Sequence, residues 1–179
     1  MSRKTVIIGI AGLLASLILL FPSTARAAQY YLQYIGNSFQ PKTDSLSFMK
    51  GGEGYLYHND TSDASYFCPV NFSVPDGSVH FIKSIGMRYR DGLPDAHLYV
   101  ELLRRNLYTG SWHTVASWQS NHEGSSSSIL TASKATNTGY KLADIKKFSY
   151  WLHVAFIRDG EANPSSDLML YQVRVHYGT

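Results

Sequence analysis

The feature that most constrains the fold of this chain is an alternation of apolar and polar residues with a period of two. In the segment 66–74, tyrosine, cysteine, valine and phenylalanine occupy every second position. In the segment 169–177, apolar residues alternate with Gln172, Arg174 and His176. This spacing places the apolar side chains on one face of a β-strand. A sheet with one apolar face must cover that face with another layer.

Short strands separated by turns are expected along most of the chain. The main expected strands cover residues 30–35, 66–74, 79–90, 97–102, 112–120, 150–157 and 169–177. Pro69 predicts a sheet edge or a bulge, because proline donates no hydrogen bond to a ladder. The stretch 129–147 looks less regular, with a short helical turn near 142–147. The pattern predicts an all-β fold, an antiparallel β-sandwich or jelly roll of about 8–10 strands, formed by one domain over 28–179.

The N-terminal 27 residues have the layout of a secretory signal peptide. Arg3 and Lys4 precede an uncharged, mostly apolar run over 6–21, and Ala25-Arg26-Ala27 resembles a cleavage site. The alternative is an uncleaved anchor, but the run of about 16 residues is shorter than the roughly 20 of a relaxed span. The sequence therefore predicts a protein that is secreted, periplasmic or at the cell surface, with no membrane span after cleavage.

Charge and cysteine content limit the partners and the sources of stability. Three of the 16 Lys and Arg residues lie within 1–27, and the remainder balance the 13 acidic residues. A near-neutral domain with scattered cations argues against nucleic-acid binding, which needs a clustered basic surface. Cys68 is the one cysteine, so no internal disulfide forms. Its place on the apolar face of 66–74 predicts burial, and the alternative is a disulfide between two copies.

Several turn and strand features resemble a largely uncharacterised group of bacterial exported single-domain β-sandwich proteins. They are Phe39-Gln40-Pro41, Gly51-Gly52, the segment 70–77, Tyr89-Arg90-Asp91 and the closing strand 171–177. The resemblance implies a fold and an exported setting, and it supplies no activity and no site residues. Members of the group often carry paired cysteines, whereas this chain has one.

Metal binding receives limited support. The seven histidines show neither the His-x-His nor the His-Glu-x-x-His spacing of zinc sites. For calcium, the oxygen-rich turn with Asp159, Glu161 and Asp167 is the main candidate, because hard cations prefer several oxygen ligands on a loop. The alternative, which we favour, is that Asp and Asn fill turns for local backbone reasons. No other cofactor is expected.

Aromatic side chains are the remaining functional candidates, since no nucleophile elbow or phosphate loop is present. Trp112 and Trp118 lie six residues apart on one expected strand, so a regular strand places both on the same face. Trp151 is opposite the row of Tyr150, Leu152 and Val154. Flat rings on a sheet suit stacking on sugar rings. The alternative is that Trp112 and Trp118 pack in the core or cap its edge.

Two functions from different classes follow. The first is an exported, non-enzymatic recognition module that binds extracellular glycan or a cell-surface partner, with Trp112, Trp118 and Trp151 as ligand-binding residues. The second is a structural or self-assembling subunit, a homo-oligomer in which the aromatic segment 30–35 adds to a neighbour's sheet. For that segment, pairing within its own sheet is the favoured alternative.

Overall fold

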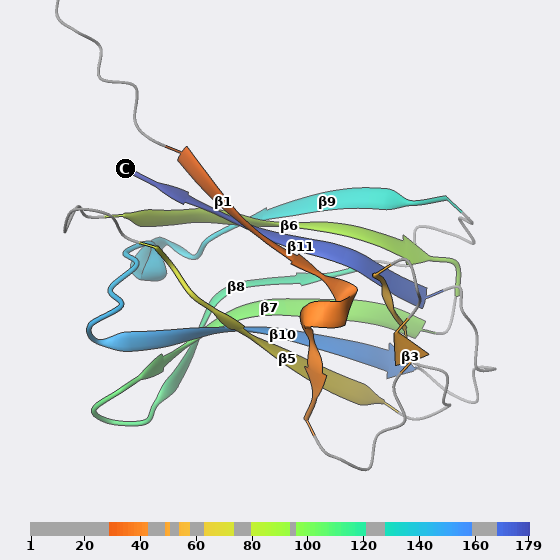
Figure 1. Cartoon of the computed structure of the whole chain (residues 1–179), viewed down its shortest axis with the longest axis horizontal. Helices are drawn as coiled ribbons and strands as arrows, with labels where there is room; N and C mark the ends of the chain where they lie inside the picture. Colours follow the sequence, from red (N-terminus) through yellow and green to blue (C-terminus); the bar gives the residue numbers. More distant parts are fainter. Residues whose placement is uncertain are drawn as a thin grey trace, which may run out of the picture.

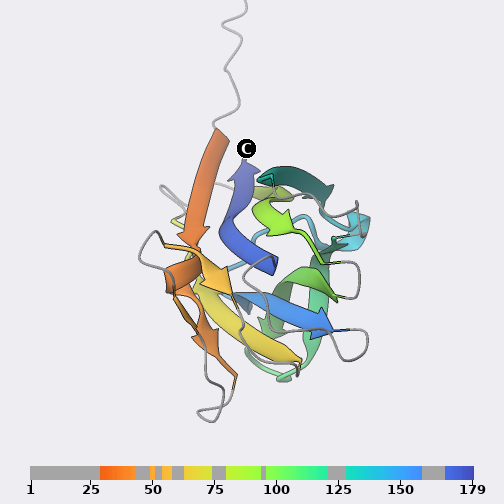
Figure 2. The same ribbon diagram turned by 90° about the vertical axis from the view of Figure 1, so that its right-hand side faces the viewer.

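The chain folds into two antiparallel β-sheets stacked face to face, as Figures 1 and 2 show from the side and from the end. The computed structural model describes residues 29–42, 49–50, 54–57, 63–73, 80–93, 96–120, 128–158 and 168–179. The predicted all-β sandwich is confirmed. The predicted signal peptide, 1–27, lies outside the described residues. Within the described part of the chain, no helix is long and apolar enough to cross a membrane.

Among the described residues, sheet A has six strands and sheet B has five. In sheet A the order is β3-β4-β11-β6-β9, and β1 also pairs with β11. Its strands are β1 (Gln29–Ile35), β3 (Met49–Lys50), β4 (Leu56–Tyr57), β6 (Phe81–Asp91), β9 (Leu130–Ala135) and β11 (Leu168–Gly178). In sheet B the order is β2-β5-β10-β7-β8. Its strands are β2 (Gln40–Pro41), β5 (Ala64–Val70), β7 (Ala96–Asn106), β8 (Trp112–Gln119) and β10 (Phe148–Arg158).

The core is formed by the side chains that the two sheets turn toward each other. Leu152 on β10 lies between Cys68 on β5 and Leu102 on β7, and all three are buried. Val173 and Val175 supply the matching buried positions on β11. The predicted burial of Cys68 is confirmed, since its residue is 4% exposed. Burial raises the pKa of its thiol, which keeps it in the unreactive protonated form.

The first described strand pairs within its own chain. β1 runs antiparallel to β11 from Gln29 opposite Gly178 to Ile35 opposite Gln172. The short 3₁₀ helix Gly36–Ser38 then turns the chain away, and β4 continues along the same edge of β11. Gly36 is required there because a Cβ atom would collide with the backbone of residues 55 and 56. Segment 30–35 therefore pairs within its own sheet, which is the alternative that the sequence analysis favours.

Two local expectations had different outcomes. Pro69 lies on β5 beyond the two residues that pair with β2, so the strand is the sheet edge at that point, as predicted. The stretch 129–147 is more regular than expected, because Leu130–Ala135 forms β9 beside β6. Its residues alternate weakly and are mostly exposed, so the apolar pattern that marks the other strands is absent. A 3₁₀ helix, Thr138–Tyr140, and a turn at 145–147 follow.

Candidate functional site

A β-bulge in β8 determines where two of the three tryptophans lie. Opposite Leu102 and Leu103 of β7, the register of β8 jumps from Ala116 to Thr114, and Val115 is the extra residue. Val115 and Ala116 are both buried. An extra residue reverses the alternation of faces beyond it. The expectation that Trp112 and Trp118 share one face is therefore wrong.

The two tryptophans lie on opposite sides of sheet B. Trp118 pairs with the buried Val100 and packs edge-on against Tyr89 of sheet A, with ring centroids 4.7 Å apart. Trp112 pairs with Arg105 and is 48% exposed. The Arg105 guanidinium lies 5.6 Å from the centre of the Trp112 ring. The predicted alternative, packing at the core edge, thus holds for Trp118, and Trp112 remains on the outer face.

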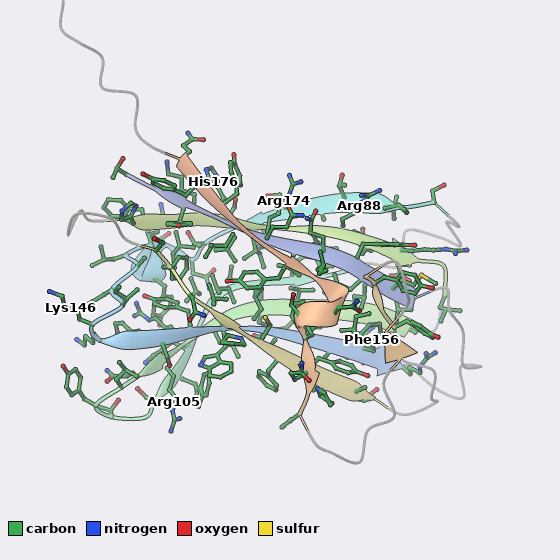
Figure 3. All side chains as sticks on the ribbon, in the orientation of Figure 1. Arg88, Arg105, Lys146, Phe156, Arg174 and His176 are labelled. Carbon is green, nitrogen blue, oxygen red and sulfur yellow. The ribbon has the colours of Figure 1, made fainter. Side chains whose placement is uncertain are left out.

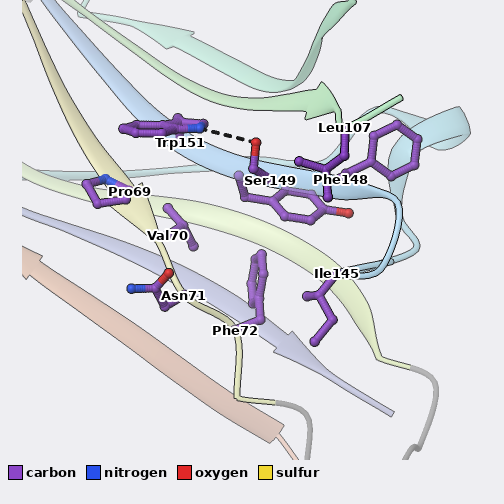
Figure 4. A pocket seen from close by; sticks show the side chains of 10 residues that line it. Pro69, Val70, Asn71, Phe72, Leu107, Ile145, Phe148, Ser149 and Trp151 are labelled. Carbon is purple, nitrogen blue, oxygen red and sulfur yellow. Dashed lines mark hydrogen bonds between the residues drawn. The ribbon is translucent and has the colours of Figure 1, made fainter. Parts of the chain in front are cut away.

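Trp151 also lies on the outer face of sheet B, beside a cleft (Figure 4). Its neighbours across the strands are Pro69 on β5 and Leu103 on β7. The indole N–H donates a hydrogen bond of 3.4 Å to Ser149 Oγ. The cleft has a volume of about 350 Å³, and Trp151, Pro69 and Phe148 are among its lining residues. The sheet spacings put the Cα atoms of Trp151 and Trp112 roughly 12 Å apart, a span wider than one sugar ring.

A hydrogen-bonded network centred on Glu101 lies next to Trp151 on the same face. Glu101 Oε1 accepts hydrogen bonds from Tyr99 Oη (3.0 Å) and Thr114 Oγ1 (3.1 Å). Glu101 Oε2 lies 3.1 Å from His153 Nδ1, and His153 Nε2 lies 3.2 Å from Ser65 Oγ. The network joins four strands, because its members come from β5, β10, β7 and β8. Phe67 stacks on the His153 ring at 4.7 Å.

The network fixes the charge and orientation of its members. The hydrogen bond from His153 is the main reason that the pKa of Glu101 lies below its usual value, with smaller effects from Tyr99 and Thr114 opposing desolvation. An ionised Glu101 accepts hydrogen bonds only, so Nδ1 of His153 carries the proton. The side chains of His153 and Glu101 are 17% and 14% exposed, so both still reach solvent. A carboxylate has about four acceptor sites, so one acceptor site of Glu101 is left for a ligand.

The line Ser65–His153–Glu101 has the order of nucleophile, base and orienting carboxylate in a catalytic triad. Acyl transfer also needs donors that stabilise an oxyanion next to the nucleophile. Across the sheet from Ser65 come Ala155 and then Tyr99, whose hydroxyl donates to Glu101. The same chain of hydrogen bonds also orients polar atoms of Glu101 and His153 on this face, where they can bind a ligand.

The outer face of sheet B forms the candidate site, which we call the sheet B platform. Its members are Phe67, Pro69, Tyr99, Glu101, Trp112, Trp151 and His153, with the adjoining cleft. Sequence reasoning found Trp112 and Trp151 and missed the other members. A signal was present, since Phe67, Tyr99, Glu101 and His153 each occupy the polar positions of alternating strands. That signal does not say which strands are neighbours.

The predicted calcium ligands Asp159, Glu161 and Asp167 lie outside the described residues. In the part of the chain that the structure describes, no group of three or more His, Cys, Asp or Glu side chains is placed to hold a metal ion. Asp63, which precedes β5, accepts a hydrogen bond of 2.9 Å from the backbone N–H of Arg158. The calcium prediction therefore stays a prediction.

Comparisons with known proteins are limited to the fold. No protein-family model and no curated protein matches the sequence. Among solved structures, a xylan-binding module, CBM15, has a TM-score of 0.49 at 8% identity, covering 83% of this chain and 97% of that one. The family 11 carbohydrate-binding module from Clostridium thermocellum, in complex with a β-1,3-1,4-mixed-linked tetrasaccharide, has a TM-score of 0.37 at 12% identity, covering 88% and 91%. The Stig cyclase Fisc from Fischerella sp. TAU has a TM-score of 0.40 at 15% identity, covering 88% and 80%.

All three TM-scores are below 0.5, and the neighbours include binding modules and an enzyme, so these likenesses support no conclusion about function. The architecture implied by the resemblance to exported bacterial β-sandwich proteins is present. Membership of that group has no support from a family match.

Proposed function

We propose that the protein is a non-catalytic recognition module that binds a glycan chain on the sheet B platform. The observation that carries this proposal is the placement of Trp151 beside a fixed polar network on a solvent-facing sheet. Binding sites for small polar molecules combine apolar and aromatic surface with a few oriented polar groups. The platform has both, since Trp151 and Phe67 supply ring surface and Glu101 and His153 supply oriented polar atoms.

The shape of the platform suits an extended chain. Trp151 lines a cleft, and Trp112 extends the aromatic surface toward β8. Tyrosine and tryptophan rings present an apolar face together with a polar edge, which matches the two kinds of surface of a sugar ring. The side chains of the network lose little conformational entropy on binding, because their hydrogen bonds already hold one another in place.

Binding to soluble polysaccharides tests the proposal directly. Purified protein is run in native gels that contain xylan, mixed-linkage β-glucan, mannan or dextran, and the hit is quantified by isothermal titration calorimetry. At least one polysaccharide is expected to retard the wild type. For that polysaccharide, Trp151→Ala and Phe67→Ala are expected to weaken binding at least tenfold, a loss of about 1.4 kcal/mol each.

Two variants control the experiment. Trp118→Ala removes a tryptophan that faces the core edge, and it is expected to bind as the wild type does at temperatures where it is folded. Lys134→Ala changes an exposed residue on β9, in the opposite sheet. The proposal is wrong if no polysaccharide retards the wild type, or if Trp151→Ala binds as tightly as Lys134→Ala. Hydrolysis of the bound polysaccharide or of p-nitrophenyl acetate that stops in Ser65→Ala would contradict the non-catalytic part.

Export and assembly belong to the same proposal. A secreted, periplasmic or surface location suits a glycan-binding module, and the predicted signal peptide is its basis. The detection of Met1 at the N-terminus of exported protein would refute cleavage. The alternative, a self-assembling subunit, is addressed by light scattering of purified 28–179. A single species near the chain mass is expected, and a filament would favour the alternative.

A further inference from the structure

A second solvent-facing hollow lies on the opposite side of the sandwich, over Gly86 of β6. Across the sheet, Gly86 lies between Arg174 on β11 and Ser133 on β9. Because glycine has no side chain, a hollow of about 230 Å³ opens above it. A Cβ atom at Gly86 would meet its nearest neighbours at 3.7 and 3.9 Å, so there is room for a side chain. We call this hollow the Gly86 notch.

The walls of the notch carry hydrogen-bond donors. Arg88 and Arg174 line it from β6 and β11, together with Gln172 and Thr131. Both arginines are exposed. Figure 3 shows Arg88, Arg174 and His176 on the outer side of sheet A, whereas Arg105 lies on the other side of the sandwich. Guanidinium groups are suited to carboxylates and sulfates because they offer paired, permanently charged donors.

The described outer face of sheet A contains no acidic side chain. Its outward positions include Gln29, Tyr31, Gln33, Ile35, Ser84, Gly86, Arg88, Arg90, Thr131, Ser133, Ala135, Gln172, Arg174 and His176. Asp91, the one acidic residue of β6, is buried. Neither arginine has a described carboxylate partner, although the Arg88 guanidinium lies 5.9 Å from the centre of the Tyr171 ring. An arginine pair without a balancing acid favours an anionic ligand.

An exposed aromatic ring lies along the same face. Tyr31 is 59% exposed, and its ring stacks on His176 at 4.6 Å with an angle of 13° between the planes. His176 is two residues from Arg174 on β11, so the ring and the guanidinium are neighbours on one surface. Desolvation and the positive charge of Lys83 lower the pKa of His176, so at neutral pH the stack is uncharged. A flat ring beside a cation fits a ligand that has both a ring and a negative group.

We propose that the Gly86 notch binds the oxyanion groups, carboxylate or sulfate, of an acidic polysaccharide, with Arg88 and Arg174 holding the anion and Tyr31 stacking on a sugar ring. The proposal does not depend on the sheet B platform, because the two sites are on opposite faces. A nucleic acid is disfavoured, since its binding by counterion release needs a larger cluster of cations than this near-neutral domain carries.

The experiment compares anionic and neutral polymers on the full mature chain, 28–179. Native gels contain polygalacturonate, dextran sulfate or uncharged dextran, and titration calorimetry gives the affinities. The wild type is expected to be retarded by polygalacturonate or dextran sulfate. Arg88→Gln and Arg174→Gln are each expected to weaken that binding about tenfold, the effect of one hydrogen bond to a charged group. Arg105→Gln is the matched control, because it removes an exposed arginine from the opposite face.

Two further variants separate the notch from general charge. Gly86→Leu fills the hollow while both arginines remain, and it is expected to weaken binding as much as Arg174→Gln does. Tyr31→Ala is expected to weaken binding of the polysaccharide. It is expected to leave unchanged the binding of inorganic phosphate, which is measured by competition. All variants are first checked for an unchanged melting temperature. If Gly86→Leu does not fold, the arginine variants alone test the proposal.

Several outcomes overturn the proposal. The first is wild-type behaviour of Arg88→Gln and Arg174→Gln, and the second is an equal loss in Arg105→Gln. Binding of a single-stranded DNA oligonucleotide as tight as that of the polysaccharide would show a general polyanion surface. If phosphate displaced the bound polysaccharide at an equal concentration of charge, the notch would be an anion site that does not recognise sugar. Trp151→Ala is expected to retain anion binding, so failure of the platform and failure of the notch give different results.

Discussion

Glu101→Gln tests the central network of the platform. Glutamine keeps one oxygen for the hydroxyls of Tyr99 and Thr114, which donate to Glu101 at 3.0 and 3.1 Å. It loses the charge, and it presents an NH₂ group or a weaker acceptor to His153. A hydrogen bond to a charged group contributes about 1.5–3 kcal/mol, against about 1 kcal/mol for a neutral pair. With the smallest difference, about 0.5 kcal/mol for each of the three bonds, the free energy of unfolding is expected to fall by about 1.5 kcal/mol at neutral pH.

The difference in stability between the wild type and Glu101→Gln is expected to depend on pH in a definite direction. The folded-state pKa of Glu101 is lower than its ordinary value of 4.5. A depressed carboxyl pKa contributes stability that is fully present above the unfolded pKa and is lost as the pH falls through the folded pKa. The wild type is therefore expected to exceed Glu101→Gln by a constant amount above pH 4.5, and the gap is expected to close as the pH falls further.

Urea unfolding followed by tryptophan fluorescence measures both quantities. Thr114→Val, alone and combined with Glu101→Gln, completes a double-mutant cycle that isolates the bond between them. A coupling energy of about 1 kcal/mol is expected for this bond. The reasoning is refuted if wild type and Glu101→Gln have equal stability at neutral pH, or if their difference does not change with pH below 4.5.

Two further substitutions test the packing. Trp118→Ala is expected to lower the free energy of unfolding by about 2–3 kcal/mol, since Trp118 is partly buried against Tyr89. Trp112→Ala is expected to change it little, because Trp112 is exposed. The midpoints of urea unfolding are compared for the two variants, and equal midpoints would contradict the assignment of the two tryptophans to opposite faces. Gly36→Ala is expected to cost about 1–3 kcal/mol, because its Cβ collides with the neighbouring backbone. Gly139→Ala, whose Cβ meets nothing within 4 Å, is the control in thermal melts, and a Gly36→Ala melt that matches this control would sink the argument.

The fold was predictable because the alternation of apolar and polar residues shows directly where the strands lie. The segments around Tyr66, Tyr89, Leu152 and Val173 have an apolar residue at every second position, and each of them forms a strand of the sandwich. β9 was missed because it is an exposed edge strand, so no apolar face had to be encoded in it. A period of two reports burial of one face, and a strand that buries little gives a weak signal.

The platform was harder to predict because it depends on pairings between strands that are distant in sequence. β10 lies between β5 and β7, so His153 meets Glu101, 52 residues away, and Ser65, 88 residues away. Alternation shows that these residues face outward, but it does not select the neighbour of each strand. The bulge at Val115 shows a second limit. One extra residue reversed the faces of Trp112 and Trp118, so two tryptophans at an even spacing point to opposite sides of the sheet. In a β-sandwich, then, a binding face is specified by register as much as by composition, and Trp151 keeps its predicted place because β10 pairs regularly with both of its neighbours.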